Sequence, residues 1–185
     1  MQFYSLRQSH TPPNAIRFLQ LLVALTFVFF PLLLFGQECI DGNCVNGKGT
    51  MVYASNHRYD GEFKDGKRHG QGIMYLPLDR VISGQWQNDN IVEGTMVFAD
   101  GTQYTGQWKY GYRDGKGELT FADGRKYIGE FRAGKRHGQG TLIYPDGRVY
   151  TGEFQEGRRS GYGTMTYPDG RKKTGRFKNG EYAGP

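Results

Sequence analysis

Small or hydrophobic residues alternate with polar residues over most of this chain. Residues 70–76 read Gly-Gln-Gly-Ile-Met-Tyr-Leu, and residues 138–144 read Gly-Gln-Gly-Thr-Leu-Ile-Tyr. Successive side chains of a β-strand point to opposite faces, so one face carries glycines and large apolar groups while the other is mainly polar. No segment after residue 46 shows the 3.6-residue period of an amphipathic helix. The pattern therefore predicts antiparallel β-structure.

The alternating segments belong to a short repeat. The motif Tyr-x-Gly-x-Phe/Trp, or a close variant, begins at residues separated by 23, 22, 23, 23 and 23 positions. We divide the array into a half repeat over 47–58, five repeats over 59–172 and a half repeat over 173–184. The motif predicts a repeat core made of Tyr59, Gly61, Phe63, Trp86, Tyr104, Gly106, Trp108, Tyr127, Gly129, Phe131, Tyr150, Gly152, Phe154 and Phe177.

Turn signals divide each repeat into two strands. Asp-Gly pairs such as Asp123-Gly124 join one unit to the next, and the segment 66–70 is predicted to form the turn inside the first unit. Hairpins of this kind predict an elongated, single-layer, twisted β-ribbon. Because glycine weakens a strand interior, we expect an aromatic ring of the neighbouring strand to pack over it. The second full repeat has lost a residue, which predicts an irregular turn or kink between residues 76 and 94.

The N-terminus differs in kind from the repeats. Residues 18–35 form an apolar run without a charge, and a helix of that length spans about 27 Å, close to the ~30 Å hydrocarbon layer of a bilayer. Two interpretations of residues 1–36 stay open: a signal peptide cleaved at Gly36–Gln37, or an uncleaved signal anchor forming a transmembrane helix. Arg7 and Arg17 precede the run. Both interpretations therefore predict that the rest is exported across the inner membrane, to the periplasm or the extracellular side.

The two cysteines fit an exported location. Cys39 and Cys44 flank the turn-like tetrapeptide Ile-Asp-Gly-Asn, which can bring their Cα atoms within disulfide range. Disulfides persist outside the cytoplasm, so we expect a bond between them, with two free thiols as the alternative. Residues 37–46 are predicted to form a short linker or cap ahead of the repeats.

The composition speaks against catalysis. Glycine supplies 29 of the 185 residues, which leaves little material for the thick core that holds a deep pocket. His69 and His137 occupy equivalent positions in different repeats, so no His, Cys and carboxylate side chains converge on one place. The Gly-x-Gly blocks open no helix, which excludes a dinucleotide fingerprint. We predict neither an enzyme nor a cofactor or metal site.

The repeats resemble a known family. The blocks YDGEFKDGKRHGQG at 59–72, YTGQWKYGYRDGKG at 104–117, YIGEFRAGKRHGQG at 127–140 and YTGEFQEGRRSGYG at 150–163 resemble MORN (membrane occupation and recognition nexus) repeats. The resemblance covers about 138 of the 185 residues. It implies a β-hairpin array without an attached catalytic domain, acting as a scaffold, a dimerisation platform or a membrane-adjacent module.

Positive charge is the one suggestive chemical feature. Residues 47–185 contain 22 Lys and Arg and 16 Asp and Glu, so this part of the chain is positively charged. Several basic residues recur at one position of the predicted inner turn and are expected to stack along one long edge. This basic stripe consists of Lys67, Arg68, Arg113, Lys135, Arg136, Arg158 and Arg159. It is either a solvated edge that limits aggregation or a surface for anionic lipid and other polyanions.

Two function classes follow. The first is a non-enzymatic scaffold in the cell envelope, which binds an unidentified protein partner through its aromatic and glycine groove or through an open end strand, with a homodimer as one form. The second is a peripheral membrane-surface module that uses the basic stripe. Export argues against nucleic acid as a partner.

Overall fold

The computed structural model describes residues 36–185, and it is built entirely from strands. The strands are β1 (Gln37–Gly42), β2 (Gly47–Tyr53), β3 (Arg58–Lys64), β4 (Lys67–Leu76), β5 (Arg80–Gln87), β6 (Asn90–Val97), β7 (Gln103–Lys109), β8 (Tyr112–Thr120), β9 (Lys126–Arg132), β10 (Lys135–Ile143), β11 (Val149–Gln155), β12 (Arg158–Thr166), β13 (Lys172–Lys178) and β14 (Glu181–Gly184).

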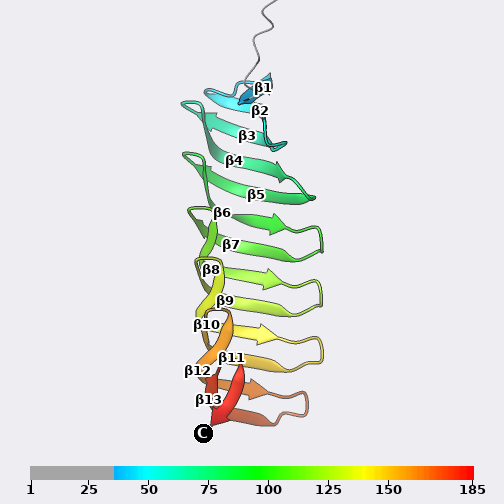
Figure 1. Ribbon diagram of the computed structural model, residues 1–185, viewed down its shortest axis with the longest axis vertical. Helices are drawn as coiled ribbons and strands as arrows, with labels where there is room; N and C mark the ends of the chain where they lie inside the picture. The colour runs from blue at the N-terminus through cyan, green and yellow to red at the C-terminus, as the bar shows by residue number, and fades with distance from the viewer. Residues whose placement is uncertain (1–35) are drawn as a thin grey trace, which may run out of the picture. The chain divides into compact units, whose positions relative to one another are not determined.

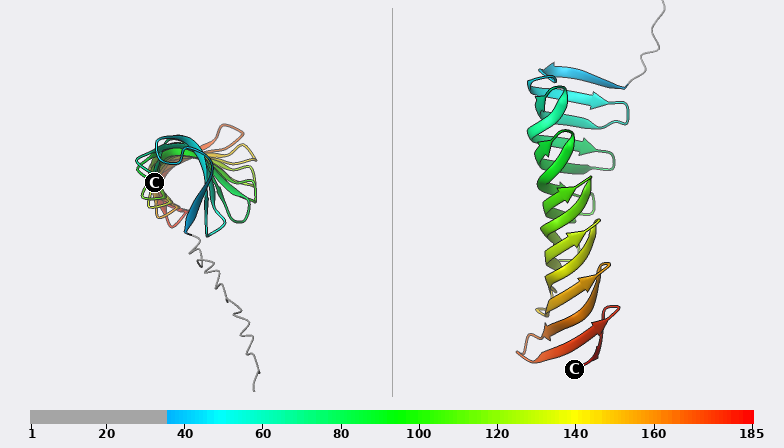
Figure 2. Two further views of the ribbon diagram at one scale, coloured as in Figure 1. Left: turned by 90° about the horizontal axis from the view of Figure 1, so that it is seen from above. Right: turned by 90° about the vertical axis from the view of Figure 1, so that its left-hand side faces the viewer.

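These strands form a single antiparallel sheet in chain order, each paired with its neighbours in sequence. Figure 1 shows them stacked along the long axis, with their turns at the two edges. Seen from above, the strands outline an arc, because the sheet is curled (Figure 2). The all-β, single-layer prediction is confirmed for this part of the chain.

The predicted N-terminal hydrophobic helix lies outside the described residues. Among residues 36–185 there is no helix with the length and apolarity needed to cross a bilayer.

A row of glycines crosses the sheet from β1 to β13. Each glycine is paired in register with the glycine of the next strand. The row continues unbroken through the later strands. Its members are Gly42, Gly49, Gly61, Gly72, Gly84, Gly94, Gly106, Gly117, Gly129, Gly140, Gly152, Gly163 and Gly175.

The strands bend sharply at this row. Tyr59 and Phe63 of β3 are four residues apart, which in a flat strand means about 13 Å. Their ring centroids are only 5.2 Å apart. Tyr127 and Phe131 of β9 repeat the arrangement at 5.1 Å. Each bent strand therefore folds its aromatic face inward around the glycine, so that face is concave and the polar face is convex across the bend.

The tyrosine ring packs directly on the glycines. A Cβ placed on Gly129 would lie 2.6 Å from the Tyr127 hydroxyl and 2.6 Å from the Cα of Gly140, and a Cβ on Gly140 would overlap the Tyr127 ring. The Tyr127 hydroxyl donates hydrogen bonds to the carbonyls of Glu130 at 2.9 Å and His137 at 3.3 Å. The expectation that an aromatic ring of the neighbouring strand packs over an interior glycine is confirmed at Gly72, Gly117, Gly140 and Gly163. It is wrong at Gly84 and Gly94, where backbone atoms and Ile91 take that place.

The aromatic residues of the predicted repeat core are all buried, at 8% exposure or less. Edge-to-face contacts join each tyrosine to a ring of the next hairpin, for example Tyr127 to Phe154 at 4.8 Å and Tyr150 to Phe177 at 4.8 Å. No charged or polar side chain is buried with them in residues 36–185. The core is thus one row of aromatic rings and aliphatic side chains that runs along the concave face of the sheet.

The turns at the two edges differ. Between units, Asp123 accepts a hydrogen bond from the Arg125 backbone N–H at 3.1 Å and Gly124 takes a φ of +84°, as the Asp-Gly signal predicts. Within a unit, the prediction of a turn over 66–70 is wrong. The turn consists of Asp65 and Gly66 alone, with φ of +51° and +70°. A two-residue turn with both φ positive matches strand twist, so residues from 67 onward already belong to β4.

The irregularity predicted between residues 76 and 94 consists of an unusual loop and a shortened β-bulge. Leu76 pairs with Arg80, and a short loop containing Leu78 and Asp79, both at positive φ, closes the hairpin. Pairing of β5 with β6 continues across the region. The sheet is therefore uninterrupted, and the missing residue shortens a β-bulge instead of kinking the array.

The segment ahead of the repeats is part of the sheet. Residues 37–42 form β1 and pair with β2, so the predicted cap is itself a strand. Cys39 and Cys44 form a disulfide with a Cα–Cα distance of 6.0 Å. Cys44 is 5% exposed and joins the core cluster, so the bond fastens the first hairpin to the first core layer.

We predict that Gly140→Ala will destabilise the array. The added methyl group has no space beneath the Tyr127 ring, and such overpacking costs about 1–3 kcal/mol. Urea unfolding should show a lower midpoint. The neighbouring Thr141→Ala change, which removes only an exposed contact with Thr151, should stay within about 0.5 kcal/mol of the parent. Equal midpoints for the two variants would contradict the packing argument.

We also predict alkaline unfolding. Burial raises the pKa of Tyr104, Tyr127 and Tyr150 to about 12, from about 10 in an unfolded chain. The folded state holds more protons in this window, so stability is unaffected below pH ~10 and falls as the pH rises toward ~12. The buried tyrosines should ionise together with the loss of the β-sheet circular dichroism. Ionisation of all tyrosines near pH 10 without unfolding would refute this.

Candidate functional site

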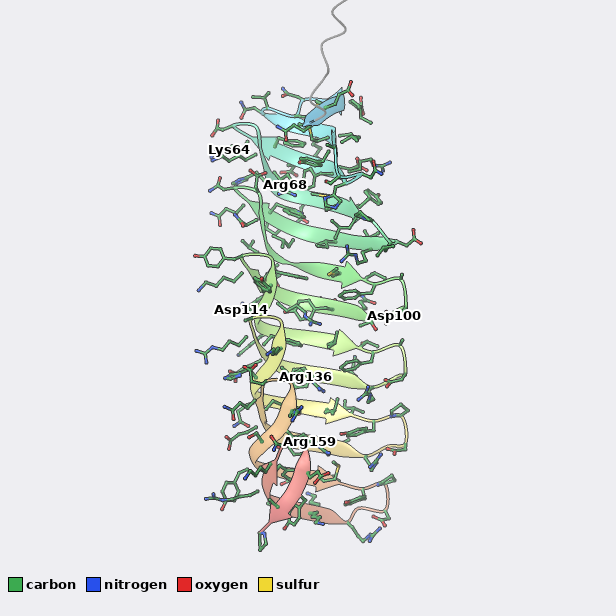
Figure 3. The ribbon with its side chains drawn as sticks, viewed as in Figure 1. Lys64, Arg68, Asp100, Asp114, Arg136 and Arg159 are labelled. Atoms are coloured by element: carbon green, nitrogen blue, oxygen red, sulfur yellow. A yellow bond between two sulfur atoms is a disulfide. The ribbon has the colours of Figure 1, made fainter. Side chains whose placement is uncertain are left out.

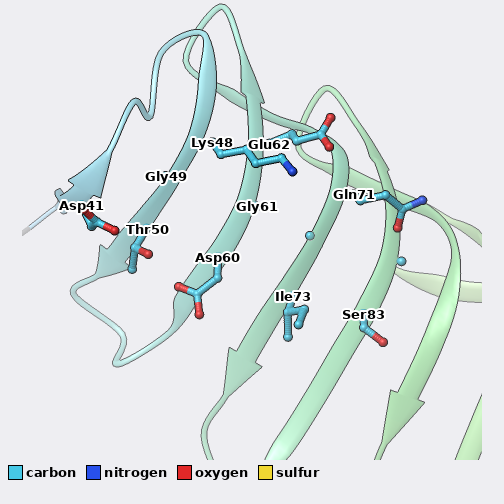
Figure 4. Close-up of a pocket in the computed structure, with 12 residues that line it drawn as sticks. Asp41, Lys48, Gly49, Thr50, Asp60, Gly61, Glu62, Gln71, Ile73 and Ser83 are labelled. Carbon is cyan, nitrogen blue, oxygen red and sulfur yellow. The ribbon is translucent and has the colours of Figure 1, made fainter.

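The polar face carries a hollow where the glycine row meets the N-terminal strands. Its volume is about 560 Å³. The backbone of Gly49 and Gly61 forms the floor, and side chains diverge from the convex bend on both sides (Figure 4). One wall holds Asp41, Thr50, Asp60, Ile73 and Ser83, and the other holds Lys48, Glu62 and Gln71. We call this surface the glycine groove.

The glycine groove recurs farther along the array. A second hollow of about 400 Å³ lies over Gly117 and Gly129. Ile128 stands on one side, and Lys116, Glu130 and Gln139 stand on the other. Ile73 and Ile128, at 37% and 45% exposure, are the apolar side chains of the two walls. Sequence reasoning missed this face, although its signal is an isoleucine at otherwise polar strand positions.

The recurring acidic residue after the motif glycine has a structural role. The first glycine of each Gly-x-Gly block lies in a β-bulge at positive φ, as at Gly138 with +55°. The backbone N–H of Gln139 donates to Glu130 Oε1 at 3.2 Å, and that of Tyr162 donates to Glu153 Oε1 at 3.0 Å. The carboxylate thus accepts a hydrogen bond from a backbone N–H that, because of the bulge, has no carbonyl partner on the neighbouring strand.

Four arginines of the basic stripe lie on strands, not in turns, which corrects the sequence prediction. They are Arg68, Arg113, Arg136 and Arg159, which are the second residues of β4, β8, β10 and β12 and which we call the arginine column. The other members of the stripe, Lys67, Lys135 and Arg158, are the first residues of β4, β10 and β12. Figure 3 shows Arg68, Arg136 and Arg159 one after another along the array. Their side chains are half-buried. The column therefore belongs partly to the packing of the sheet.

Each arginine of the column joins its own hairpin to the next. Arg113 Nη2 donates to the carbonyl of Gly134 at 2.6 Å, and its guanidinium lies 5.7 Å from the Phe131 ring centroid. Arg136 makes the same bond to Gly157 and lies 5.6 Å from the Phe154 ring. Burial lowers the pKa of Arg113 and of Arg136. These guanidinium groups thus bridge successive turns across the aromatic core.

The remaining members of the basic stripe, Lys67, Lys135 and Arg158, are exposed. Lys135 forms an ion pair with Glu156 of the next turn. A separate hollow of about 170 Å³ is lined by Arg125, Arg136, Arg158 and Arg159, with Leu142, Tyr144 and Phe154 beside them. Three arginines of the basic stripe, Arg136, Arg158 and Arg159, line this one hollow. Anion binding by the stripe stays a prediction.

His69 and His137, which take equivalent positions in two repeats, lie far apart in the sheet. His69 lies on β4 and His137 on β10, six strand spacings or roughly 29 Å apart. The Nδ1 atom of each is buried without a hydrogen-bond partner in the described structure. Within residues 36–185, no three or more His, Cys, Asp and Glu side chains gather as metal ligands would.

Comparison with known proteins identifies the repeat. The MORN repeat family model matches residues 46–58, 59–77, 83–103, 104–124, 127–147 and 150–170. It does not match the final segment, where β13 and β14 nevertheless continue the sheet. A comparison with curated proteins finds no match.

Solved structures show only a distant likeness in fold. The TCP domain of Drosophila melanogaster SAS-4 (dCPAP), in complex with a proline-rich motif of Ana2 (dSTIL), is 13% identical with a TM-score of 0.34, covering 94% of this chain and 99% of that one. The TCP10 domain of Danio rerio CPAP, in complex with a STIL peptide, is 20% identical with a TM-score of 0.32, covering 75% and 84%. Such low values carry no inference about function.

We predict unequal effects for two adjacent basic residues. Arg136→Ala removes a half-buried guanidinium that stacks on Tyr127 and Phe154 and bonds to Gly157, which should cost about 1–3 kcal/mol. Lys135→Ala removes only an exposed ion pair, worth about 0–1 kcal/mol. Urea midpoints measure both. If the two variants unfold alike, the arginine column does not stabilise the array.

Proposed function

Because this chain belongs to the MORN repeat family, a family of protein-interaction or membrane-associated repeat modules, we propose that it is a non-enzymatic scaffold that binds a protein partner. The observation that carries the proposal is the glycine groove, which recurs along the polar face over different repeats. A repeated hollow offers the same contacts at regular intervals and so suits an extended polypeptide.

The shape of the glycine groove supports a partner that crosses the strands. The groove follows the glycine row, so it runs along the array and perpendicular to each strand. A bound segment cannot pair as an additional strand in that direction. It would use side-chain contacts, for which Thr50, Ser83 and Gln71 offer hydrogen-bonding groups and Ile73 an apolar surface.

The aromatic face supports the proposal by exclusion. Its rings are buried against one another and form the core, so little of them is left for a ligand. The array can therefore offer a partner its convex polar face and its turn edges. The equivalent polar groups of consecutive repeats lie about 10 Å apart, a spacing that suits binding along a surface better than chemistry at one point.

The location in the cell envelope is part of this proposal. Arg7 and Arg17 followed by the apolar run 18–35 support export, with the leader either removed or kept as an anchor. The disulfide between Cys39 and Cys44 is consistent with a compartment that keeps cysteines oxidised.

Association with an anionic membrane surface is the second candidate. The hollow lined by Arg125, Arg136, Arg158 and Arg159 favours it, together with the exposed Lys135 that begins β10. Each basic side chain near an anionic bilayer contributes about 1 kcal/mol, and salt screens this attraction. High salt should therefore abolish membrane binding, whereas binding in the glycine groove should persist.

We predict that charge in the glycine groove will block the partner. The double variant Ile73→Asp and Ile128→Asp places carboxylates on both groove sections, and both side chains are already partly exposed, so the fold should survive. Pull-down with the full-length chain, followed by mass spectrometry, identifies the partner that the parent retains. The groove variant should capture that partner at least tenfold less well.

The matched control is Val45→Asp with Leu78→Asp. These side chains are 59% and 79% exposed and lie in loops away from the groove. The control should capture the partner as the parent does. Equal capture by the groove variant and the parent, with circular dichroism unchanged, would refute binding in the glycine groove.

A further inference from the structure

Neighbouring inner turns are joined at regular steps along one edge. The backbone N–H of Gly134 donates to the carbonyl of Arg113 at 2.9 Å, and that of Gly157 donates to Arg136 at 3.0 Å. Each arginine of the column also donates a side-chain hydrogen bond to the carbonyl of that same turn residue, which is Asp89 for Arg68 and a glycine for the other three. The arginine column thus ties each turn to the next twice.

One step of this edge departs from the rule. Ile91 takes the position that an arginine has at the other steps, because it pairs with Trp86 as Arg113 pairs with Trp108. In the described structure, no hydrogen bond joins the backbone N–H of Gly111 to the carbonyl of Ile91, and no side chain donates to the carbonyl of Gly111. Both ties are therefore missing between the turn at Asn88 and the next turn.

A hollow of about 400 Å³ opens at this step, and we call it the Ile91 gap. It is lined by Gln87, Asn88, Asn90, Ile91, Val92, Trp108, Lys109 and Tyr110. Ile91 itself is 4% exposed and fills the space that an arginine stem takes elsewhere. The gap lies beside Ile91, the residue that takes the place of a column arginine at this step.

The groups that hold a guanidinium elsewhere are present here. Tyr110 and Gly111 have φ of +50° and +77°, close to +47° and +83° at Ala133 and Gly134, so the turn is of the kind whose glycine carbonyl Arg113 reaches. One hairpin earlier, Arg68 lies 4.8 Å over the Trp86 ring.

Trp108 occupies the position of Trp86 in the next hairpin, and its indole donates to a glycine carbonyl at 3.2 Å as that of Trp86 does. No cation lies within stacking distance of Trp108 in residues 36–185. The ring and the carbonyl are thus a guanidinium site without a guanidinium from this chain.

We infer that the Ile91 gap binds an arginine side chain of a protein partner, with the guanidinium stacked on Trp108 and donating to the carbonyl of Gly111. The array itself provides the template, since Arg68, Arg113 and Arg136 make these contacts within the chain. Planar guanidinium groups suit aromatic stacking combined with hydrogen bonding, which ammonium groups do not reproduce. The inference is independent of the glycine groove.

The remaining lining residues are compatible with this ligand. Asn88 and Gln87 offer amide oxygens as further acceptors, and the exposed Tyr110 offers a second ring, whose centroid lies 5.8 Å from Lys109 Nζ. Lys109 is the one cation of the lining. Arg132 follows Phe131 in the chain as Lys109 follows Trp108. Arg113 nevertheless lies over Phe131 and donates to the carbonyl of Gly134, so a cation at this position does not prevent a guanidinium from binding.

The test titrates the full-length protein with N-acetyl-arginine amide and follows the indole N–H resonances of its two tryptophans by NMR. The Trp108 signal should shift and saturate at millimolar ligand, while the Trp86 signal, already covered by Arg68, stays in place. N-acetyl-lysine amide at the same concentration should produce no saturating shift. A Trp86→Phe variant assigns the two signals.

Ile91→Arg should abolish the response, because the chain then supplies its own guanidinium. The matched control is Val97→Arg, which adds the same charge at an exposed position of β6 and should keep the response. If Ile91→Arg does not fold, Tyr110→Ala removes an exposed lining ring and should weaken binding severalfold.

Three results would overturn the inference. They are an equal response to the lysine amide, a response that persists in folded Ile91→Arg, and saturation by N-acetylglucosamine in place of the arginine amide. The last of these would assign the amides and rings of the Ile91 gap to a glycan.

Discussion

The contact between a tyrosine ring and the glycines beside it underlies the whole array. A flat single-layer sheet leaves both faces in water and buries nothing. Here each strand bends at its glycine, so that Tyr127 and Phe131 of one strand meet at 5.1 Å and cover the backbone of Gly129 and Gly140. A second layer becomes unnecessary, because every strand folds over its own side chains and the next hairpin closes the remaining side.

The same bend decides where a ligand can approach. Side chains on the polar face diverge where the strand is convex, and the glycine backbone is left as the floor of the glycine groove. The rings of the aromatic face are buried in the core and leave little surface for a ligand. The bend at the glycine row thus produces both a buried row of hydrophobic side chains on the concave face and a repeated shallow groove on the convex face.

Along one edge of the described sheet, the inner turns from β4 onward show a second regularity with one interruption. The arginine column ties successive turns through paired bonds to backbone carbonyls. Where Ile91 replaces the arginine, the core gains an apolar side chain and the edge loses both ties. A repeat protein gives most of its surface the same chemistry, so a departure of this kind is where a partner can recognise one position along the array.

The sequence by itself determined the fold class, the period and the buried rings, because a two-residue alternation with glycine at fixed places has one consistent β-hairpin solution. It also placed the Cys39–Cys44 bond, whose loop is short enough to be judged locally. Only the tertiary structure decided what the repeated polar residues do. Glu130 caps a bulge, and Arg136 leaves the predicted turn for a strand and bonds to Gly157. These roles depend on which backbone atoms of the next hairpin lie within reach, and that geometry is set by the bend and the register of the sheet, which a pattern along one strand does not contain.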